Sequence, residues 1–246
     1  MKKHKTPDME SNIDFFIPTL NNTGYVLSKL DDLSLAFIEY ASSTKDKALE
    51  IGAGFGFVVE QALSRNIEIY CNDIEPKHIE IINQLANNTN RHLLTTVCGQ
   101  FPEQVDFPDN FFSAILISRV IHLFPGEAIE ASFKKIFRWL KPSGKAFIVA
   151  DTPYLRNFEK FISKYEQRVQ KGEKWPGLIL DTSKYLDKHR ALIPSLVHFM
   201  DEVVLKRVLI ESGFEIKKLY LMNRIDYPEN RRFDGRESVG VIAQKP

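Results

Sequence analysis

The chain has 246 residues, of which 43% are hydrophobic and 26% are charged, and its formal net charge at pH 7 is +1. This length suits one α/β domain with its own core and leaves little room for a second. The near-neutral charge disfavours a nucleic-acid partner, because proteins that bind nucleic acids gain much of their affinity from basic residues that neutralise phosphates.

The N-terminal segment and the cysteines give no sign of export. Met1–Ser11 is polar and lacks the apolar centre of a signal peptide, and no apolar run approaches the ~20 residues that span a bilayer. A cytoplasmic location without membrane contact is therefore expected. Cys71 and Cys98 lie in apolar, strand-like runs, which predicts two buried thiols and no disulfide framework.

The N-terminal part is expected to cap the domain. Residues 13–23 are apolar and then turn-like. From Val26 to Ala41 the apolar residues recur at roughly helical spacing, which predicts an amphipathic helix packed on a sheet.

Predicted strands and helices alternate between residues 47 and 151. The strands are expected at 47–52, 67–72, 93–98, 113–118 and 145–150. The helices are expected at 56–65, from about 75 onward, and at 127–140. Such alternation with short connections is typical of a doubly wound, mostly parallel sheet, so the predicted fold class is α/β.

The pattern changes after Asp151. The insert that follows the fifth strand is charged and predicted to be helical, with one helix over Tyr154–Gln170. A last helix and two strands follow, and the two strands should pair as an antiparallel hairpin at the sheet edge. We therefore expect one domain over 1–246 with four parts: a cap (13–45), a core (46–151), a helical lid (152–200) and a final helix with its strand pair (201–246).

A glycine-rich turn follows the first predicted strand. Gly52, Gly54 and Gly56 form a G-x-G-x-G pattern, in which glycine permits positive φ and a close approach of a ligand to the main chain. The dinucleotide fingerprint asks for glycine or alanine where Phe57 stands, and the Gly-Lys-Ser/Thr of a P-loop is missing. The turn therefore predicts a nucleoside-type ligand other than a dinucleotide or a triphosphate.

Asp73 ends the second predicted strand, about twenty residues beyond the glycines. A carboxylate at this point can accept both ribose hydroxyls of an adenosine ligand. Capping of the helix that begins near Pro76 is the alternative role.

Five segments in the same order and spacing carry a resemblance to a known family. They are Leu49–Gly56, Asn72–Pro76, Val97–Gln100, Phe107–Phe112 and Phe137–Gly144. Together they cover about residues 45–151 and resemble the class I S-adenosylmethionine-dependent methyltransferases. The resemblance implies a seven-stranded sheet with a final antiparallel pair.

The resemblance also implies S-adenosylmethionine as the cofactor. Its methionine part would lie near Glu50, its ribose on Asp73 and its adenine near Gln100. Gln100 replaces a residue that is usually acidic, but its amide oxygen can still accept from the adenine amino group. The implied cofactor residues are Glu50, Gly52, Ala53, Gly54, Gly56, Asp73, Ile74, Gln100, Phe101 and Ser118.

Two histidines are candidates for chemistry on the acceptor. His122 lies just past the fourth strand and could act as a general base or position the acceptor, although a histidine bonded within a turn is the alternative. His198 is the second candidate, and capping of the following helix competes with that role. The remaining histidines, His4, His78, His92 and His189, are predicted to lie at the surface.

The acceptor side is expected to form beneath the insert. Its candidate lining residues are Tyr154, Phe158, Phe161, Trp175, Leu178 and Phe199, with packing inside the insert as the alternative. Tyr25 and the segment 13–25 could close the other side.

The last loop carries Arg224, Arg231, Arg232 and Arg236. This cluster could contact an anionic acceptor, but a solvated loop balanced by neighbouring acids is the favoured interpretation.

The sequence thus predicts methyl transfer from S-adenosylmethionine to an oxygen or nitrogen of a small-molecule acceptor. No metal is expected, because no group of His, Asp and Glu has ligand spacing. The strand end Ser118–His122 lacks the Asn/Asp-Pro-Pro-Tyr/Phe pattern of enzymes that methylate amino groups of nucleobases or glutamine. A protein or RNA methyltransferase and a non-catalytic binding protein are the alternatives, and the chain could form a homodimer.

Overall fold

The computed structural model describes residues 16–186 and 192–246. The predictions for Met1–Ser11, residues 13–15, His4 and His189 lie outside these ranges. Within them, no helix has the length and apolar character that crossing a membrane requires.

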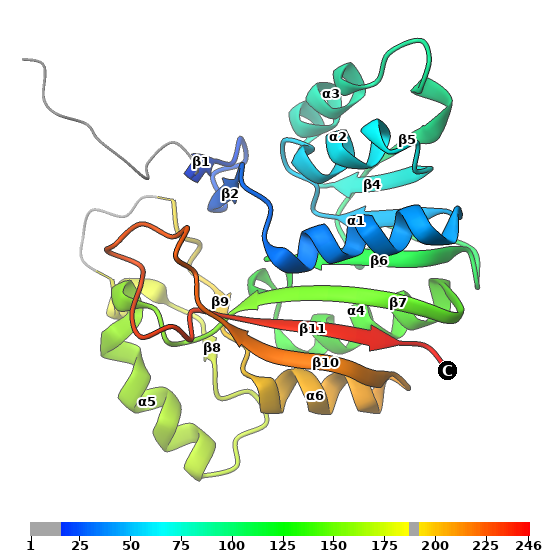
Figure 1. Cartoon of the computed structure of the whole chain (residues 1–246). Coiled ribbons are helices and arrows are strands. Elements are labelled where there is room, and N and C mark those ends of the chain that lie inside the picture. The colour runs from blue at the N-terminus through cyan, green and yellow to red at the C-terminus, as the bar shows by residue number, and fades with distance from the viewer. Residues whose placement is uncertain (1–15, 187–191) are drawn as a thin grey trace, which may run out of the picture.

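A seven-stranded sheet forms the centre of the described chain (Figure 1), in the order β10-β11-β7-β6-β3-β4-β5. Its strands are β3 (Ala48–Ile51), β4 (Ile69–Asp73), β5 (Leu94–Cys98), β6 (Phe112–Ser118), β7 (Leu140–Asp151), β10 (Glu215–Met222) and β11 (Ser238–Gln244). Strands β3 to β7 pair in parallel, and β11 pairs antiparallel with both β7 and β10. The predicted fold class is confirmed, although β7 begins at Leu140 and not at Lys145.

Helices cover both faces of this sheet. One face carries α1 (Asp32–Thr44), α2 (Phe57–Ser64) and α3 (Pro76–Leu85), and the other carries α4 (Gly126–Trp139) and α6 (Glu202–Glu211). Alternate residues of central strand β6 therefore enter opposite cores, and four consecutive residues are fully buried: Ala114, Ile115, Leu116 and Ile117. A parallel strand buried on both sides needs such a continuous apolar run.

The order of the strands determines where a ligand can bind. Strand β3 lies between β4 and β6, so the chain leaves β3 toward one side of the sheet and later returns on the other. In doubly wound sheets the crevice at this switch point, outside the carboxyl ends of the strands, is the usual ligand site.

The N-terminal part differs from its prediction. Val26 to Leu30 is not helical, because β1 (Phe16–Pro18) and β2 (Tyr25–Leu27) form an antiparallel pair. Helix α1 begins only at Asp32, after Asp31 accepts a hydrogen bond from the Ser34 N–H at 2.9 Å. The helical spacing of the apolar residues from Val26 onward therefore predicted too early a start, because the N-cap at Asp31 determines where the helix begins.

The insert after β7 is only partly helical. A short turn of 3₁₀ helix precedes α5 (Glu159–Gln170), so the helix does not start at Tyr154 as predicted. Strands β8 (Leu178–Ile179) and β9 (Val197–His198) pair antiparallel within the insert. The insert has its own core, which also takes in Leu27 and Tyr227, so it packs on the N-terminal hairpin and on the last loop.

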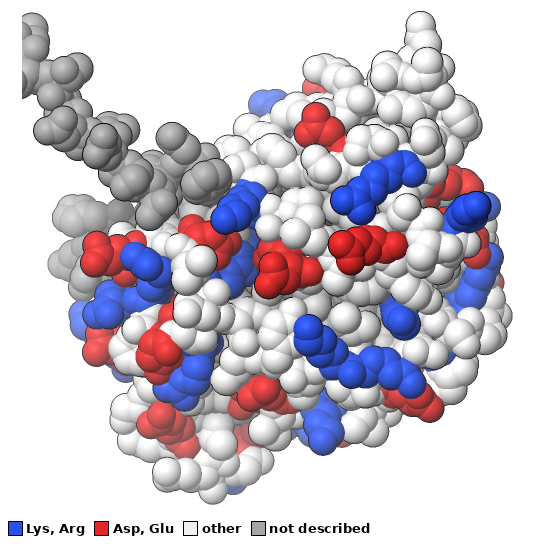
Figure 2. Space-filling model, viewed as in Figure 1, with Lys and Arg blue, Asp and Glu red and all other residues white. Residues whose placement is uncertain are grey.

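Charges of both signs are interspersed over the face seen in Figure 2. One of the arginines of the last loop is buried, however. Arg224 is 1% exposed, and its guanidinium donates to Asp226 at 2.7 and 3.0 Å and lies 3.4 Å from the Asp31 carboxylate. The expected solvated loop is therefore wrong for Arg224, which ties this loop to the N-cap of α1.

Replacing Arg224 by methionine should destabilise the protein by about 3–5 kcal/mol, because it leaves Asp226 in the interior without its cation. Urea denaturation followed by circular dichroism measures this loss. Arg236→Met is the matched control, since Arg236 forms a partly exposed pair with Asp234 whose loss should be below about 1 kcal/mol. Equal losses for the two variants would contradict a structural role for the buried pair.

Candidate functional site

A cavity of about 680 Å³ opens at the carboxyl ends of the parallel strands. It runs from the glycine turn after β3 to the insert, and the N-terminal hairpin closes its side. Ten predicted site residues line it: Glu50, Gly52, Ala53, Gly54, Asp73, Ile74, Gln100, Phe101, Ser118 and His122. Gly56 and His198 are not among the lining residues.

The glycine turn brings the main chain against its neighbours. Gly52 and Gly54 have φ of +74° and +55°, which side chains rarely adopt. A Cβ at Gly52 would lie 2.3 Å from Val120 Cγ2, and one at Gly54 would lie 2.8 Å from Val26 Cγ2. Gly56, by contrast, precedes α2 and faces α3, so it shapes the helix start and not the cavity wall.

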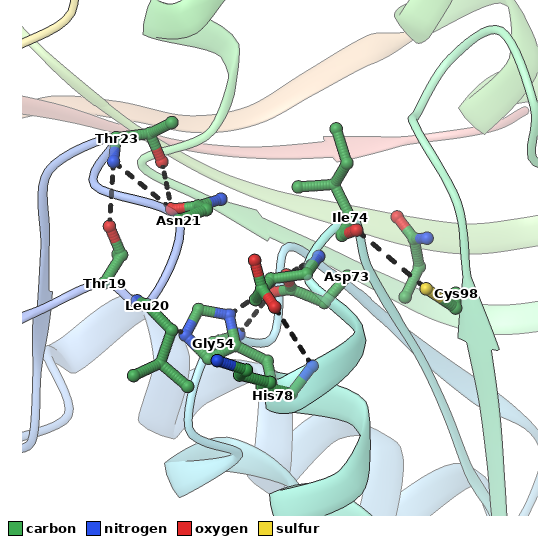
Figure 3. Close-up of polar contacts among 12 residues, drawn as sticks. Thr19, Leu20, Asn21, Thr23, Gly54, Asp73, Ile74, His78 and Cys98 are labelled. Carbon is green, nitrogen blue, oxygen red and sulfur yellow. Dashed lines mark hydrogen bonds and ion pairs between the residues drawn. The ribbon is translucent and has the colours of Figure 1, made fainter.

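Asp73 connects this turn to α3 (Figure 3). Its Oδ2 accepts from the Gly54 N–H at 2.7 Å, and its Oδ1 accepts from the Glu75 N–H at 2.9 Å and contacts His78 Nδ1 at 3.1 Å. The carboxylate is therefore held at the end of β4, and Oδ2 keeps capacity for a further donor. The N-cap of α3 is Glu75 and not Asp73.

His78 is buried at 1% exposure, so its predicted surface position is wrong. It lies on the face of α3 that turns toward Asp73, and its ring packs on Phe55 with centroids 4.9 Å apart. Its Nε2 accepts from the Leu20 N–H at 3.3 Å, which leaves the proton of the neutral ring on Nδ1, toward Asp73. His78 thereby connects the ribose-binding candidate with the N-terminal hairpin.

The adenine end of the cavity is apolar and open. Ile74 is 52% exposed, and Phe101 is buried beneath. The Gln100 N–H donates to Gln104 Oε1 at 2.9 Å, and Gln100 itself is exposed and lines the cavity. Cys98, predicted to be buried, is exposed because it ends edge strand β5, where its Sγ lies 3.9 Å from the Ile74 carbonyl oxygen.

The burial and the missing hydrogen-bond partner of Glu50 show whether these residues fit S-adenosylmethionine. It is 6% exposed, and its Oε2 has no hydrogen-bond partner in the described chain. Burial, and then the charge of Asp73, raise the pKa of Glu50 well above its usual range. A buried carboxyl group without a partner, beside a turn with no side chains, fits an ammonium group. Glu50 and Asp73 therefore fit the amino and ribose ends of this cofactor.

The other end of the cavity collects polar groups that lack partners. Four lining residues contribute buried atoms without a hydrogen bond in the described chain: Ser118 Oγ, Arg119 Nη1, His122 Nδ1, and Asn157 Oδ1 and Nδ2. Burial lowers the pKa of His122, against the opposing charge of Asp151, so its imidazole is neutral at pH 7. This end can therefore bind a polar ligand and accept a proton.

Asp151 lies beside this group at the end of β7. Its Oδ1 accepts from the Tyr227 hydroxyl at 2.7 Å and from Ser238 Oγ at 2.9 Å. Burial acts to raise the pKa of Asp151, but His122, Tyr227 and nearby arginines outweigh it and lower the value. Asp151 is therefore ionised, and its charge favours a proton on His122.

His198 is held away from the cavity. It is fully buried, its Nδ1 lies 3.0 Å from the Phe124 carbonyl oxygen, and its ring packs on Trp175. Burial lowers its pKa to about 4, against the opposing bond to Phe124. It does not cap α6 either, because Asp201 accepts from the Val204 N–H at 2.7 Å.

Only two of the six lining residues predicted for the insert line the cavity. Phe158 and Phe199 line the cavity, as does Tyr25 from β2. The other four candidates, Tyr154, Phe161, Trp175 and Leu178, do not, and Phe161 belongs to the core of the insert, as the alternative interpretation had it. Arg119 and Asn157 also line the cavity and were not among the predicted site residues. Arg119 lies within the strand end Ser118–His122, whereas Asn157 had no sequence signal. Arg231 lines the cavity as well, although a solvated loop was the favoured interpretation of its arginine cluster.

Comparisons with known proteins agree with this geometry. Residues 49–148 match the methyltransferase domain family. The ubiquinone/menaquinone biosynthesis C-methyltransferase UbiE of Vibrio cholerae is 29% identical over 119 residues, which are 48% of this chain and 43% of that protein. The chain thus aligns with less than half the length of this curated relative.

Two solved structures share the fold. A methyltransferase from Methanosarcina mazei has a TM-score of 0.64 at 18% identity, covering 88% of this chain and 98% of its own. The second is the 1,6-didemethyltoxoflavin-N1-methyltransferase of Burkholderia thailandensis, solved with 1,6-didemethyltoxoflavin and S-adenosylhomocysteine. It has a TM-score of 0.57 at 15% identity, and the match covers 87% of this chain and 78% of that one. These comparisons confirm the predicted resemblance to the class I S-adenosylmethionine-dependent methyltransferases and, with it, their methyl donor. The match to the methyltransferase domain family covers residues 49–148 of this chain.

Proposed function

We propose that this protein transfers a methyl group from S-adenosylmethionine to an oxygen or nitrogen atom of a small-molecule acceptor. The observation that carries the proposal is the single cavity that joins Glu50 and Asp73 at one end to the unpartnered polar groups around His122 at the other. An acceptor that is enclosed in this way has the size of a metabolite and not of an RNA or a protein.

The named relatives support a small acceptor. The names of the Vibrio cholerae and Burkholderia thailandensis proteins refer to C-methylation in ubiquinone and menaquinone biosynthesis and to N1-methylation of 1,6-didemethyltoxoflavin. In the proposal, residues 46–151 bind the cofactor, and parts of 13–45 and 152–200 close over the acceptor. The segment 201–246 completes the sheet within the same domain.

The bound cofactor would supply a methyl group already activated on a sulfonium. The residues of the chain then have two tasks. Glu50, Asp73 and the glycine turn orient the donor end, and the walls of the cavity hold the acceptor in line and exclude water. His122, neutral and without a partner at Nδ1, takes the proton of an acceptor hydroxyl or amine. The Asp151 carboxylate stabilises the imidazolium that results.

A methyl-transfer screen over metabolite classes, read as release of S-adenosylhomocysteine, tests the function. Release with at least one small acceptor is expected. Release only with RNA or protein substrates would mean that the methyl acceptor is a macromolecule and not a small molecule. Failure to bind S-adenosylmethionine in calorimetry would overturn the proposal.

The role of His122 makes a separate prediction once an acceptor is known. His122→Gln should lower kcat by about 10²- to 10⁴-fold and leave the affinity for S-adenosylmethionine unchanged. In the unmodified protein, activity should fall as the pH drops through a value below 6.5, because protonation removes the base. His92→Gln, at an exposed position, is the control. An unchanged kcat and a profile without an acid limb would argue against a base at this position.

A further inference from the structure

The acceptor end of the cavity carries charges of both signs. Arg119 and Arg231 line it together with Asp31 and Asp151, so its partly and fully buried charges balance, and the further cation among the lining residues, Lys29, is exposed. The two carboxylates are already engaged, because Asp31 contacts Arg224 and Asp151 accepts from Tyr227 and Ser238. The two guanidinium groups are therefore the groups of this end that can take a further acceptor.

Arg231 lies close enough to Asp151 for its charge to help lower the pKa of that carboxyl group, but the two do not form an ion pair. The Arg231 guanidinium lies 5.1 Å from the ring centroid of Phe16 and 5.2 Å from that of Tyr25. Within the described part of the chain, no carboxylate oxygen forms an ion pair with it. The two rings fix the guanidinium at the wall of the cavity but leave its N–H donors available.

Arg119 is also incompletely paired. Its Nη1 is buried without a hydrogen bond, and the nearest carboxylate oxygen, Asp31 Oδ2, is 3.8 Å away. Asp31 is already engaged, since it caps α1 through Ser34 and contacts the buried Arg224. Arg119 therefore keeps donors directed to the cavity that it lines.

Asn157 completes the group. It lies at the start of the insert and lines the cavity, and both its Oδ1 and its Nδ2 are buried without partners. A buried polar group without a hydrogen bond is destabilising by about 1–3 kcal/mol, so a site of this kind gains from a ligand that supplies the missing bond. The Nδ2 group can donate to the same oxygen acceptor as the two guanidinium groups.

We propose that Arg119, Asn157 and Arg231 form a subsite for a carboxylate carried by the acceptor, and that the acceptor is a small ring acid. The inference rests on the proposed function and names its substrate class. A planar carboxylate matches the fork of guanidinium donors. Because the cations and carboxylates of this end balance, a carboxylate with one negative charge fits it better than a phosphate with about two. The aromatic lining residues Phe16, Tyr25, Phe158 and Phe199 provide faces for a ring.

Matched pairs of ring compounds test this subsite by binding, without the need for turnover. Calorimetry uses the full chain saturated with S-adenosylhomocysteine. The probes are salicylate and 4-hydroxybenzoate, their methyl esters, and phenyl phosphate. The acids should bind at least tenfold more tightly than their esters. Arg231→Gln should remove this preference while changing the affinity for S-adenosylhomocysteine less than twofold. Arg236→Gln, at a partly exposed pair with Asp234, should keep it.

The outcomes separate the inference from the function on which it rests. Esters that bind as well as the acids, acids that do not bind, or an acid preference that survives Arg231→Gln would each overturn the carboxylate subsite alone. Tighter binding of phenyl phosphate than of the acids would overturn it in favour of a phosphate. Failure of S-adenosylhomocysteine to bind would instead overturn the proposed function, and the inference with it.

Discussion

Replacing Asp73 by alanine is expected to weaken the binding of S-adenosylmethionine by about 10- to 100-fold. The carboxylate is fixed by the Gly54 and Glu75 N–H groups and by His78, and it faces the cavity next to the glycine turn. A hydrogen bond to a charged group contributes about 1.5–3 kcal/mol, and about 1.4 kcal/mol corresponds to a tenfold change in affinity. Loss of one bond from a ribose hydroxyl to Oδ2, which keeps capacity for a further donor, therefore accounts for the expected effect.

Calorimetry with the full chain measures this affinity, and a thermal melt checks that each variant is folded. His78→Ala should give a smaller loss, because it removes a group that positions Asp73 and leaves the carboxylate in place. Asp181→Ala, which removes a partly exposed carboxylate outside the cavity, should bind as the unmodified protein does. An Asp73→Ala variant that binds within threefold of the unmodified protein would rule out the ribose role.

The cofactor half of the cavity could be predicted because its parts are local in the sequence. The strand, the turn and the start of the next helix are consecutive, and the acidic residue ends the following strand. Gly52 and Gly54 have positive φ, which glycine alone adopts without strain. The glycines in the sequence therefore indicate the backbone conformation of the turn directly. The alternating apolar runs likewise fixed the order of elements along the chain.

Other residues of the site could not be predicted in the same way, because segments far apart in the sequence decide whether they are buried or reach the cavity. His78 looked like a surface residue of an amphipathic helix, but a main-chain contact from Leu20, 58 residues away, covers it. Arg231 and Arg236 stand in one polar loop, yet only Arg231 reaches the cavity. Neither periodicity nor spacing distinguishes such positions, since tertiary packing decides them.

Glu50 is expected to release a proton when S-adenosylmethionine binds. Burial, followed by the charge of Asp73, raises the pKa of Glu50 well above its usual range. The free protein therefore holds this carboxyl partly or fully protonated on the acid side of neutrality. An ammonium group seated against Oε2 favours the ionised form and lowers the pKa again. Below the raised pKa, binding should thus weaken as the pH falls, by up to about tenfold per unit for one linked proton.

Calorimetry at pH 6 in buffers of low and high ionisation enthalpy detects this proton. In the unmodified protein the apparent binding enthalpy should differ between phosphate and imidazole by an amount that corresponds to as much as one released proton. Glu50→Gln should abolish the difference and weaken binding by about 10- to 100-fold, because a neutral amide replaces a charged partner of the ammonium group. Glu60→Gln, exposed on α2, should alter neither quantity.

A buffer-independent enthalpy in the unmodified protein, or an unchanged difference in Glu50→Gln, would mean that Glu50 does not contact the amino end of the cofactor. The unpartnered Oε2 would then need a different ligand group, because a buried carboxyl oxygen without a hydrogen bond is otherwise a net cost to the fold.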